Sequence, residues 1–549
     1  MHRFALLVLL TLLPVAAFAQ RDRSHGRSMV ITQNGIVATS QVLASQAAAQ
    51  ILAKGGSAAD ASIAANAVLG VIEPGMDGIG GDIFVLYREA STGKVHGLNG
   101  SGWAPKRLTA DFLASKGIRN KMPSDGIHSA TVPGCVDGWW RMHQKFGKLP
   151  WKSLFDAAIK FAEQGFPLQE TASGHWQTAK LANSAAGKQL FHPEGKVPQM
   201  GSIWKNPGLG RALRLIAEGG RDAYYKGDIA KAILRTSNEL GGAFDAADLA
   251  DFQSEWVTPI TTEYRGWKVT ELPPNGQGIS ALIMLNLMER FTPGRTTNDP
   301  EWLHTKIEAM KLAYSDLATY IADPKYAAIP TEALLSKNYA ASRAKLIGKN
   351  ANCGVRPGKP IESDTTYLSV VDKEGNITSW IQSVSGMWGS YVVVDGMGFH
   401  LHNRGAGFSL DSKHPNMLAS RKRPFHTIIP GVMEKDDIAI GFGIMGGPNQ
   451  PLAHAQFVSN MVDHGLNLQA ALEASRFTKP NSQGCEVTVE SRIGIPALTE
   501  LGARGHELLL KPEYTQSMGR GNAVMRNFKT KVNYGASDPR ADGAAIPEP

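Results

Sequence analysis

The sequence ESDTTYLSVVDKEGN, residues Glu362 to Asn376, contains the start of a predicted β-hairpin. Over residues 366–371 the side chains alternate as in a half-buried strand, and residues 372–376 have turn chemistry. A second strand pattern follows over residues 377–384, so the sequence predicts a β-hairpin. The junction in front of it, Asp364–Thr365, has two interpretations. It is an ordinary polar start of a hairpin, or a place where the chain is cut so that Thr365 becomes an N-terminus.

A threonine at a chain terminus has chemistry that an internal threonine lacks. Its own α-amino group, with an ordinary pKa of about 7.7–8.0, can accept the hydroxyl proton and activate the oxygen as a nucleophile. The same hydroxyl could first attack the carbonyl of Asp364, shift the acyl group from nitrogen to oxygen, and leave an ester for water to hydrolyse. Residues 345–364 show little periodicity and predict a loop, which suits a cut at the cleavage site Asp364–Thr365.

The first residues predict export. Met1–Ala19 has an early basic residue, an apolar run over residues 4–13, and small residues where a signal peptidase cuts. The alternative is an uncleaved membrane anchor, but the run is short for a span and Pro14 interrupts it. We expect a signal peptide over residues 1–19, a secreted and periplasmic protein, and no later membrane span.

The composition is that of a large globular chain, with 549 residues, 43% of them hydrophobic and 19% charged. The net charge of +8 is small for this size and no basic, aromatic-interleaved stripe is present, so nucleic-acid binding is not expected. The three cysteines, Cys135, Cys353 and Cys485, are widely spaced and argue against a disulfide framework or a structural zinc site. They allow at most one disulfide, and the sequence does not choose its ends.

Helix-like and strand-like segments alternate along the chain, without internal repeats. Helices are expected over residues 40–54, 58–69, 278–320, 451–463 and 468–476, and they dominate residues 151–239. Strands are expected over residues 83–87, 94–98 and 258–272, besides the hairpin.

A glycine-rich turn at Gly441–Gly446 matches the dinucleotide fingerprint but lacks an acidic residue at the end of a following strand, and Pro448 alters the turn. We therefore disfavour a nucleotide site. The other use of such a turn is to present backbone N–H groups, and Gly446 and Gly447 could direct two of them at a developing oxyanion.

Four histidines, His400, His402, His414 and His426, raise the question of a metal. On a strand, His400 and His402 would share a face and could bind a metal ion together. No third ligand is identifiable, so surface or core histidines are the favoured interpretation, and neither a metal nor a cofactor is expected.

With the junction and the glycine pair identified, the chain resembles the γ-glutamyltransferase (glutathione hydrolase) family of N-terminal-nucleophile hydrolases. The resemblance covers essentially the whole chain after residue 19. The matching motifs are Gly55–Ala61, Gly78–Gly81, Ala104–Lys106, Val132–Gly134, Pro273–Pro274 with Gly278, Glu308–Asp316, Thr365–Asp372, Asn403–Arg404, Arg423–Pro424, Gly446–Gly447 and Tyr534–Arg540.

This resemblance implies an α+β protein, a four-layer αββα sandwich, made as a proenzyme that cuts itself before Thr365. The large subunit would be residues 20–364 and the small catalytic subunit residues 365–549, and the two would stay together as an autoprocessed heterodimer. Thr365 would be nucleophile and, through its amine, base. Gly446 and Gly447 would hold the oxyanion, and Ser383 would support the nucleophile as the family's second threonine does.

The departures from the family bear on the substrate. Ser101 stands where the glutamyltransferases have an arginine for the α-carboxylate, and Gly407 where they have an aspartate for the α-amino group. His426 and Thr427 replace two serines, and Ser385 an asparagine. Each lost charge-assisted contact is worth about 1.5–3 kcal/mol, so recognition of a glutamyl group should be weak.

Arg404, beside Asn403, resembles instead the arginine of the family's acylase-like and amidohydrolase branches. It could bind a carboxylate through two hydrogen bonds, or it could belong to a structural ion pair. The segment between Ser409 and Arg423 is also about ten residues shorter than the lid of typical bacterial members, which favours water as the acceptor.

These features lead to a principal hypothesis: an exported, self-cleaving amidohydrolase that transfers a carboxylate-bearing acyl group to water. One alternative is true γ-glutamyl hydrolase or transpeptidase activity on glutathione, with a clamp rebuilt from Arg404 and His426. Another is a binding protein without turnover. The substrate-binding candidates are Asn403, Arg404, His426, Ser385 and Ser101.

Overall fold

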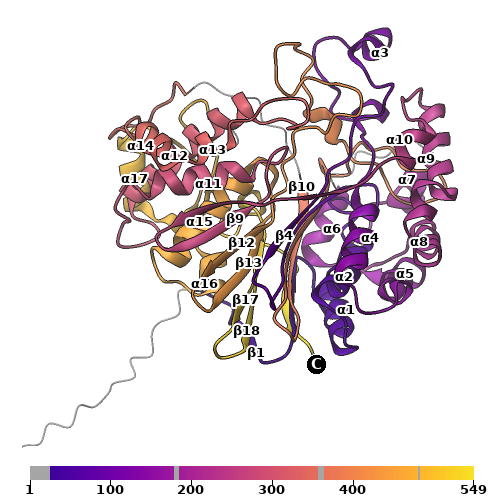
Figure 1. Ribbon diagram of the computed structural model, residues 1–549, viewed down its shortest axis with the longest axis horizontal. Helices are drawn as coiled ribbons and strands as arrows, with labels where there is room; N and C mark the ends of the chain where they lie inside the picture. Colours follow the sequence, from indigo (N-terminus) through magenta and orange to yellow (C-terminus); the bar gives the residue numbers. More distant parts are fainter. Residues whose placement is uncertain (1–24, 178–184, 356–363, 480–481) are drawn as a thin grey trace, which may run out of the picture.

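The computed structural model describes residues 25–177, 185–355, 364–479 and 482–549. Two seven-stranded sheets lie face to face, and helices cover the outer face of each (Figure 1). This arrangement confirms the expected α+β, four-layer αββα sandwich. The expected signal peptide, residues 1–19, lies outside the described residues. None of the helices in the described ranges has the length and hydropathy that a membrane crossing requires.

The predicted hairpin forms the centre of one sheet, here called the nucleophile sheet. Its strands are all antiparallel to their neighbours. In spatial order they are β19 (Ala544–Pro547), β2 (Ile36–Thr39), β10 (Asp364–Val371), β11 (Ile377–Ser385), β3 (Asp82–Arg88), β4 (Val95–Gly100) and β7 (Glu255–Val257).

The facing sheet, here called the glycine-turn sheet, is antiparallel as well. Its spatial order is β1 (Val30–Thr32), β18 (Val532–Ser537), β17 (Gly521–Asn527), β13 (Ile438–Ile444), β12 (Gly431–Lys435), β9 (Trp267–Glu271) and β8 (Ile260–Tyr264). Both sheets therefore combine strands from before and after Thr365. A cut at that residue would leave two chains interleaved through both sheets.

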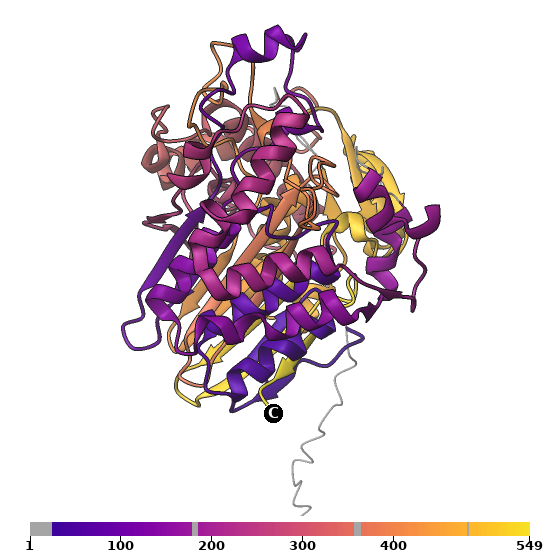
Figure 2. The same ribbon diagram turned by 90° about the vertical axis from the view of Figure 1, so that its right-hand side faces the viewer.

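Two helical layers bury the outer faces of the sheets. Over the nucleophile sheet lie α1 (Val42–Ala53), α2 (Ala58–Ile72), α4 (Cys135–Phe146), α5 (Asp156–Gln164) and α8 (Pro207–Tyr225), which face the viewer in Figure 2. Over the glycine-turn sheet lie α11 (Gly278–Met288), α12 (Pro300–Tyr320), α15 (Gln450–Val462), α16 (Leu468–Glu473) and α17 (Ile495–Ala503).

Shorter elements complete the fold. The helices are α3 (Ala110–Ser115), α6 (Glu170–Gln177), α7 (Ala185–Phe191), α9 (Asp228–Glu239), α10 (Ala246–Ala250), α13 (Thr331–Leu335) and α14 (Lys337–Ala344). A small sheet joins β14 (Phe477–Thr478), β15 (Glu486–Glu490) and β16 (Glu507–Lys511), and a second pairs β5 (Phe166–Pro167) with β6 (Ile203–Trp204).

The hairpin prediction is confirmed, but the prediction that its first strand is half-buried is wrong. Every residue from 365 to 371 is buried, and so is all of β11. The reason is that α2 covers one face of the hairpin and strands β13 and β17 of the other sheet cover the opposite face. The alternation of side chains along this strand therefore shows only which face of the sheet each side chain occupies. Both faces of the sheet are buried in the core.

Two long predicted segments are each divided. The strand-like residues 258–272 form β8 and β9, because Arg265 and Gly266 both have positive φ and make a tight turn between them. The helical stretch 278–320 forms α11 and α12, and the second helix starts anew at Asp299, whose side chain caps it, with Pro300 in the first turn.

Candidate active site

Thr365 is the second residue of the central strand β10 and is fully buried. Its Oγ1 accepts a hydrogen bond from Nε2 of Gln450 across 3.4 Å. Gln450 is the first residue of α15, so the hydroxyl lies beside the turn that precedes this helix. The chain is continuous through Thr365, and the residue therefore carries an amide nitrogen here rather than the free amine of a cut chain.

The turn beside Thr365 is the predicted glycine pair. Gly446 and Gly447 have φ angles of 130° and 57°, which only glycine adopts without strain, and they connect β13 to α15. Nε2 of Gln277 donates to the carbonyl of Gly447 across 2.8 Å and so fixes the turn. No described group accepts a hydrogen bond from the N–H of either glycine. Two amides in the turn before Gln450, the residue that contacts Thr365, are thus available to a negatively charged oxygen.

Ser383 lies on β11, the strand paired with β10, and it joins the predicted site to Arg404. Its Oγ accepts from the backbone N–H of Ser385 at 2.8 Å and from the Arg404 guanidinium at 3.2 Å. A second nitrogen of Arg404 donates to Oγ1 of Thr427 across 2.7 Å. The structure therefore brings the expected support of the nucleophile and the expected substrate-binding arginine into contact.

Arg404 is buried, and its Nε has no hydrogen-bond partner among the described residues. No carboxylate in the described part of the chain lies within ion-pair distance of it, which leaves the ion-pair interpretation without a partner. Burial lowers the pKa of Arg404 to about 10, and the negative charge of Asp82 opposes this shift. The side chain is therefore a cation at neutral pH with one N–H direction unused.

Asp82 is a site residue that the sequence interpretation missed. One carboxylate oxygen accepts from the backbone N–H groups of Gly102 at 3.0 Å and Gly134 at 3.2 Å. The other oxygen lies 3.0 Å from Nε2 of His426, and Nε2 of His402 lies 3.7 Å from the first oxygen. The only sequence signal was its position, directly after the Gly78–Gly81 motif and at the start of a strand.

These contacts set the ionisation of Asp82. Burial acts to raise the pKa of its carboxyl, but His402, His426 and Arg404 outweigh this effect and the pKa is lowered. Burial likewise lowers the pKa of His426 to about 3, so this imidazole is neutral at neutral pH. Asp82 is therefore ionised at neutral pH, and its electrostatic neighbours include the neutral His426 and the cationic Arg404.

Two substrate-binding candidates, His426 and Ser101, are held by the protein itself. His426 packs its ring against Phe84 at a centroid distance of 4.7 Å, in addition to its contact with Asp82. Ser101 is fully buried, and its hydroxyl accepts from Nδ2 of Asn275 at 3.1 Å. Both lie in the same region as Arg404 but have polar partners already.

The other two candidates shape the backbone beside Ser383. Ser385 has a φ of 78°, a strained conformation for a residue with a side chain. Asn403 holds the next residue, because its Oδ1 accepts from the N–H of Gly386 at 2.7 Å while its Nδ2 donates to the carbonyl of Ser124 at 2.7 Å. Through these two hydrogen bonds Asn403, the residue before Arg404, holds the backbone just after Ser385 in place.

Asp77 was missed as well. Its carboxylate accepts from the hydroxyl of Thr366, the residue after the candidate nucleophile, at 3.0 Å and from Nδ2 of Asn66 at 2.9 Å. Burial raises the pKa of Asp77 well above its ordinary value. It lies directly before the Gly78–Gly81 motif, but nothing in the sequence linked it to Thr366.

The dinucleotide motif and the histidine set take other roles. Strand β13 is antiparallel to both of its neighbours, so its glycine turn does not belong to a βαβ unit. His400 packs against Phe191 and Trp388, and burial lowers its pKa to about 4, whereas His402 bonds to Thr131. No metal cluster in the described ranges includes any of the four histidines.

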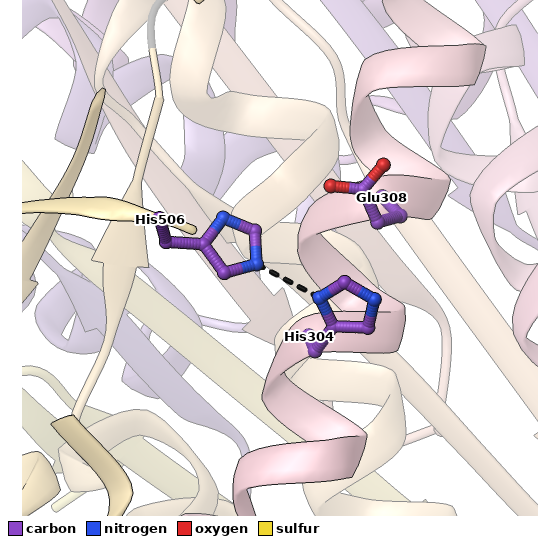
Figure 3. Close-up of side chains that lie close together, drawn as sticks. All are labelled: His304, Glu308 and His506. Carbon is purple, nitrogen blue, oxygen red and sulfur yellow. Dashed lines mark hydrogen bonds between the residues drawn. The ribbon is translucent and has the colours of Figure 1, made fainter. Parts of the chain in front are cut away.

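A different cluster, His304, Glu308 and His506, has the residue types of a metal site (Figure 3). Its two rings are already hydrogen-bonded to each other, with Nδ1 of His304 2.8 Å from Nε2 of His506. Glu308 accepts from the buried ammonium of Lys311 at 2.7 Å. Burial, together with the charges of Lys311 and Lys479, lowers the pKa of His506 to about 3. The positive charges of these lysines favour an uncharged histidine pair and oppose the binding of a divalent metal ion.

Two surface hollows, of about 480 and 460 Å³, lie elsewhere. They share Arg141, Gln253 and Trp256 and include none of the residues around Thr365. The hollows therefore belong to a different part of the surface from the candidate site.

Comparisons with known proteins give a consistent result. The profile of the family described as Gamma-glutamyltranspeptidase matches residues 44–548. The crystal structure of cephalosporin acylase from Bacillus halodurans superposes with a TM-score of 0.90 at 40% identity, over 95% of this chain and 97% of that one.

Two curated proteins extend the result. The glutathione hydrolase-like YwrD proenzyme of Bacillus subtilis is 36% identical over 94% of this chain and 99% of its own length. The oxamate amidohydrolase proenzyme of Klebsiella pneumoniae is 30% identical over 94% of this chain and 98% of its own length.

Proposed function

This chain belongs to the gamma-glutamyltranspeptidase family, and from that premise we propose that it is an exported, self-cleaving amidohydrolase with Thr365 as its nucleophile. It is an enzyme of the hydrolase and acylase type, and two relatives that match 94% of it are proenzymes. The proposal adds the position of the cut, Asp364–Thr365, the removal of residues 1–19 on export to the periplasm, and the kind of substrate.

The proposed reaction is acyl transfer in two steps. The freed amine of Thr365 accepts the proton of its own hydroxyl, the oxygen attacks the amide carbonyl, and the C–N bond breaks as the amine leaves with that proton. An acyl ester on Thr365 remains, and water hydrolyses it. The N–H groups of Gly446 and Gly447 would stabilise the oxyanion in both steps, and Ser383 would orient the nucleophile from the adjacent strand.

The observation that carries the substrate class is Arg404, a buried cation next to Ser383 with one N–H direction unused. A carboxylate on the acyl group could accept from this guanidinium, a charge-assisted contact worth about 1.5–3 kcal/mol. The relative named oxamate amidohydrolase supports the choice, because oxamate is an amide whose acyl half carries a carboxylate.

Glutathione hydrolysis remains the second candidate because of the glutathione hydrolase-like relative. The residues around the site favour it less. A γ-glutamyl group also presents an α-ammonium, which needs a carboxylate, and Gly407 supplies none. Asp82, the nearby buried carboxylate, already accepts from two backbone amides and contacts His426. The third hypothesis, a binding protein without turnover, is not retained for a chain of this enzyme family.

A matched set of anilides tests the proposal. Glutaryl, valeryl and γ-L-glutamyl p-nitroanilide share one leaving amine and differ in the far end of the acyl group. We expect the glutaryl compound to give a kcat/KM at least about 10-fold above both others, because it alone offers a carboxylate without an ammonium. Equal values for glutaryl and valeryl would remove the carboxylate from the proposal. Faster turnover of the γ-glutamyl compound would favour the second candidate.

A further inference from the structure

One disulfide is present in the described residues, and it joins Cys353 to Cys485. Their Cα atoms lie 4.9 Å apart, within the range that a disulfide spans. The third cysteine, Cys135, is buried in α4 and free. The sequence allowed three pairings, and the fold selects this one.

The two ends of this bond lie on opposite sides of the proposed cleavage site, since Cys353 precedes Asp364–Thr365 and Cys485 follows it. We propose that cleavage turns the Cys353–Cys485 disulfide into an inter-subunit bond, so that the mature enzyme is a covalently linked heterodimer. This inference rests on the proposed cut, because in an uncut chain the same bond only closes a loop.

Contacts that do not pass through the junction hold Cys353 in place. The segment just before it is fixed to α12, an element of the same proposed subunit. The N–H of Asn352 lies 3.3 Å from each carboxylate oxygen of Glu308, and Nζ of Lys311 donates to the carbonyl of Asn352 at 3.1 Å. Both α12 side chains are buried. Cutting after Asp364 removes none of these bonds, so the position of the Cys353 thiol should not depend on chain continuity.

The same segment is bonded to the opposite subunit. The N–H of Ala351 donates to the carbonyl of Arg504 at 2.7 Å, and the N–H of Gly484 donates to the carbonyl of Cys353 at 3.2 Å. Nearby, the histidine pair of Figure 3 connects His304 of the large subunit to His506 of the small one. The disulfide therefore lies in a seam that is already hydrogen-bonded on both sides, where α12 packs against α17.

The chemistry of formation needs an oxidant of the disulfide class, which an oxidising export compartment supplies. One cysteine thiolate attacks the oxidant's disulfide, forms a mixed disulfide and releases one oxidant thiol. The thiolate of the second cysteine then attacks the mixed disulfide, forms the Cys353–Cys485 bond and releases the other thiol. The two cysteines lose two electrons and two protons, and the oxidant disulfide is reduced to two thiols.

The bond changes its physical role when the chain is cut. Before the cut it closes a loop between residues 132 positions apart and restricts the unfolded chain. After the cut it keeps the two chains at a high effective concentration, so that separation of the subunits becomes an intramolecular event that reverses readily. Because both sheets combine strands from the two subunits, the bond is not needed to assemble the site, and its expected effect is on resistance to dissociation.

Denaturing gels of the purified enzyme, with free thiols first blocked by N-ethylmaleimide, test the inference. We expect one band near the full-length chain without reductant and two bands with it. Two bands under both conditions would overturn the inter-subunit bond while leaving the cut intact. A single full-length band under both conditions would instead mean that the proposed cleavage has failed. The two failures are therefore distinguishable on one gel.

The three cysteines provide matched controls. Cys353→Ser and Cys485→Ser should each give two bands without reductant, whereas Cys135→Ser should keep the single linked band. Mass spectrometry of an unreduced digest of the unaltered enzyme needs no variant and should find one peptide pair that joins Cys353 to Cys485. Both cysteines recovered as N-ethylmaleimide adducts would contradict the bond even if a variant failed to fold.

Discussion

The Arg404 guanidinium donates a hydrogen bond to the Ser383 hydroxyl across 3.2 Å, and this contact links the proposed substrate-binding residue to the strand beside the proposed nucleophile. Ser383 lies on β11, which pairs with β10, the strand that contains Thr365. A group bound by Arg404 would therefore lie within a few bonds of the reacting carbonyl. Short acyl groups with a terminal carboxylate meet this geometric requirement.

Arg404→Ala should raise KM for glutaryl p-nitroanilide by about 10- to 100-fold and change KM for the valeryl compound much less. The physical reason is the loss of a charge-assisted contact worth about 1.5–3 kcal/mol that only the anionic substrate can make. The KM values of the unaltered enzyme and the variant, measured with both anilides, test this prediction directly. Arg404→Lys is the matched variant. It should recover part of the affinity, because lysine restores the positive charge but not the planar guanidinium that can donate two parallel hydrogen bonds to a carboxylate.

A purely structural role for Arg404 predicts a different outcome. The variant would then lose thermal stability and the two anilides would lose activity in equal proportion. Melting curves of the cut enzyme, recorded beside the kinetics, separate these cases.

Thr365→Ala should abolish cleavage of the chain and all turnover, because it removes the only oxygen proposed to attack in either reaction. Thr365→Ser keeps the hydroxyl and should still be cut, at a reduced rate, because serine lacks the methyl group that restricts the rotation of threonine's χ1. A reducing denaturing gel over time measures the cut, and N-terminal sequencing of the small chain should begin at residue 365. Turnover by an uncut Thr365→Ala protein would contradict the mechanism.

Gly446→Ala should lower kcat by about 100-fold or more, which is the usual effect of losing one oxyanion donor. At a φ of 130° a side chain strains the turn, and the added Cβ would lie 3.2 Å from Cα of Gly519. The N–H would shift from its position beside Thr365, while a KM set by Arg404 should change little. Kinetics with glutaryl p-nitroanilide on cut protein provide the measurement, and an unchanged kcat would exclude Gly446 from the oxyanion role.

Asp82→Asn should destabilise the protein by about 3 kcal/mol, the usual result of breaking a buried charged network from one side. The amide cannot accept all the bonds that the carboxylate now accepts from Gly102, Gly134 and His426. Urea unfolding of the uncut Thr365→Ala chain, with and without the second change, measures the difference. A loss of less than about 0.5 kcal/mol would show that His426 and the glycine amides do not depend on this charge.

The sequence predicts the hairpin and the glycine turn because both are set by neighbouring residues. Alternation and turn chemistry over residues 364–385 specify β10 and β11, and two glycines in a row specify the turn at Gly446. The role of Asp82 could not be predicted, because its partners come from three separate segments, at Gly102, Gly134 and His426. Only the packed fold brings them to one carboxylate.

Packing between distant segments also explains why the pairing of the cysteines and the full burial of the hairpin could not be predicted. The spacing of Cys353 and Cys485 carries no information about their distance in space, which depends on how α12 packs against α17. Whether an alternating strand has one face in water depends on a second sheet that the local pattern does not show.

Acid should weaken the fold below about pH 6.5, because buried histidines must stay neutral in it. The pKa is lowered by burial to about 4 for His400 and to about 3 for His426, His454 and His506. Between these values and about 6.5 the unfolded chain binds more protons than the folded one, so the free energy of unfolding falls as pH falls. The contribution of a histidine whose ring contacts no carboxyl group should be nearly constant above pH 7 and fall by about 2 kcal/mol at pH 5. His400 is such a histidine among the described residues. Urea unfolding of the uncut Thr365→Ala chain across pH 5–8 measures the free energy of unfolding, and in His400→Gln its decrease on acidification should correspond to about one proton fewer. A slope unchanged in that variant would contradict neutral burial of His400.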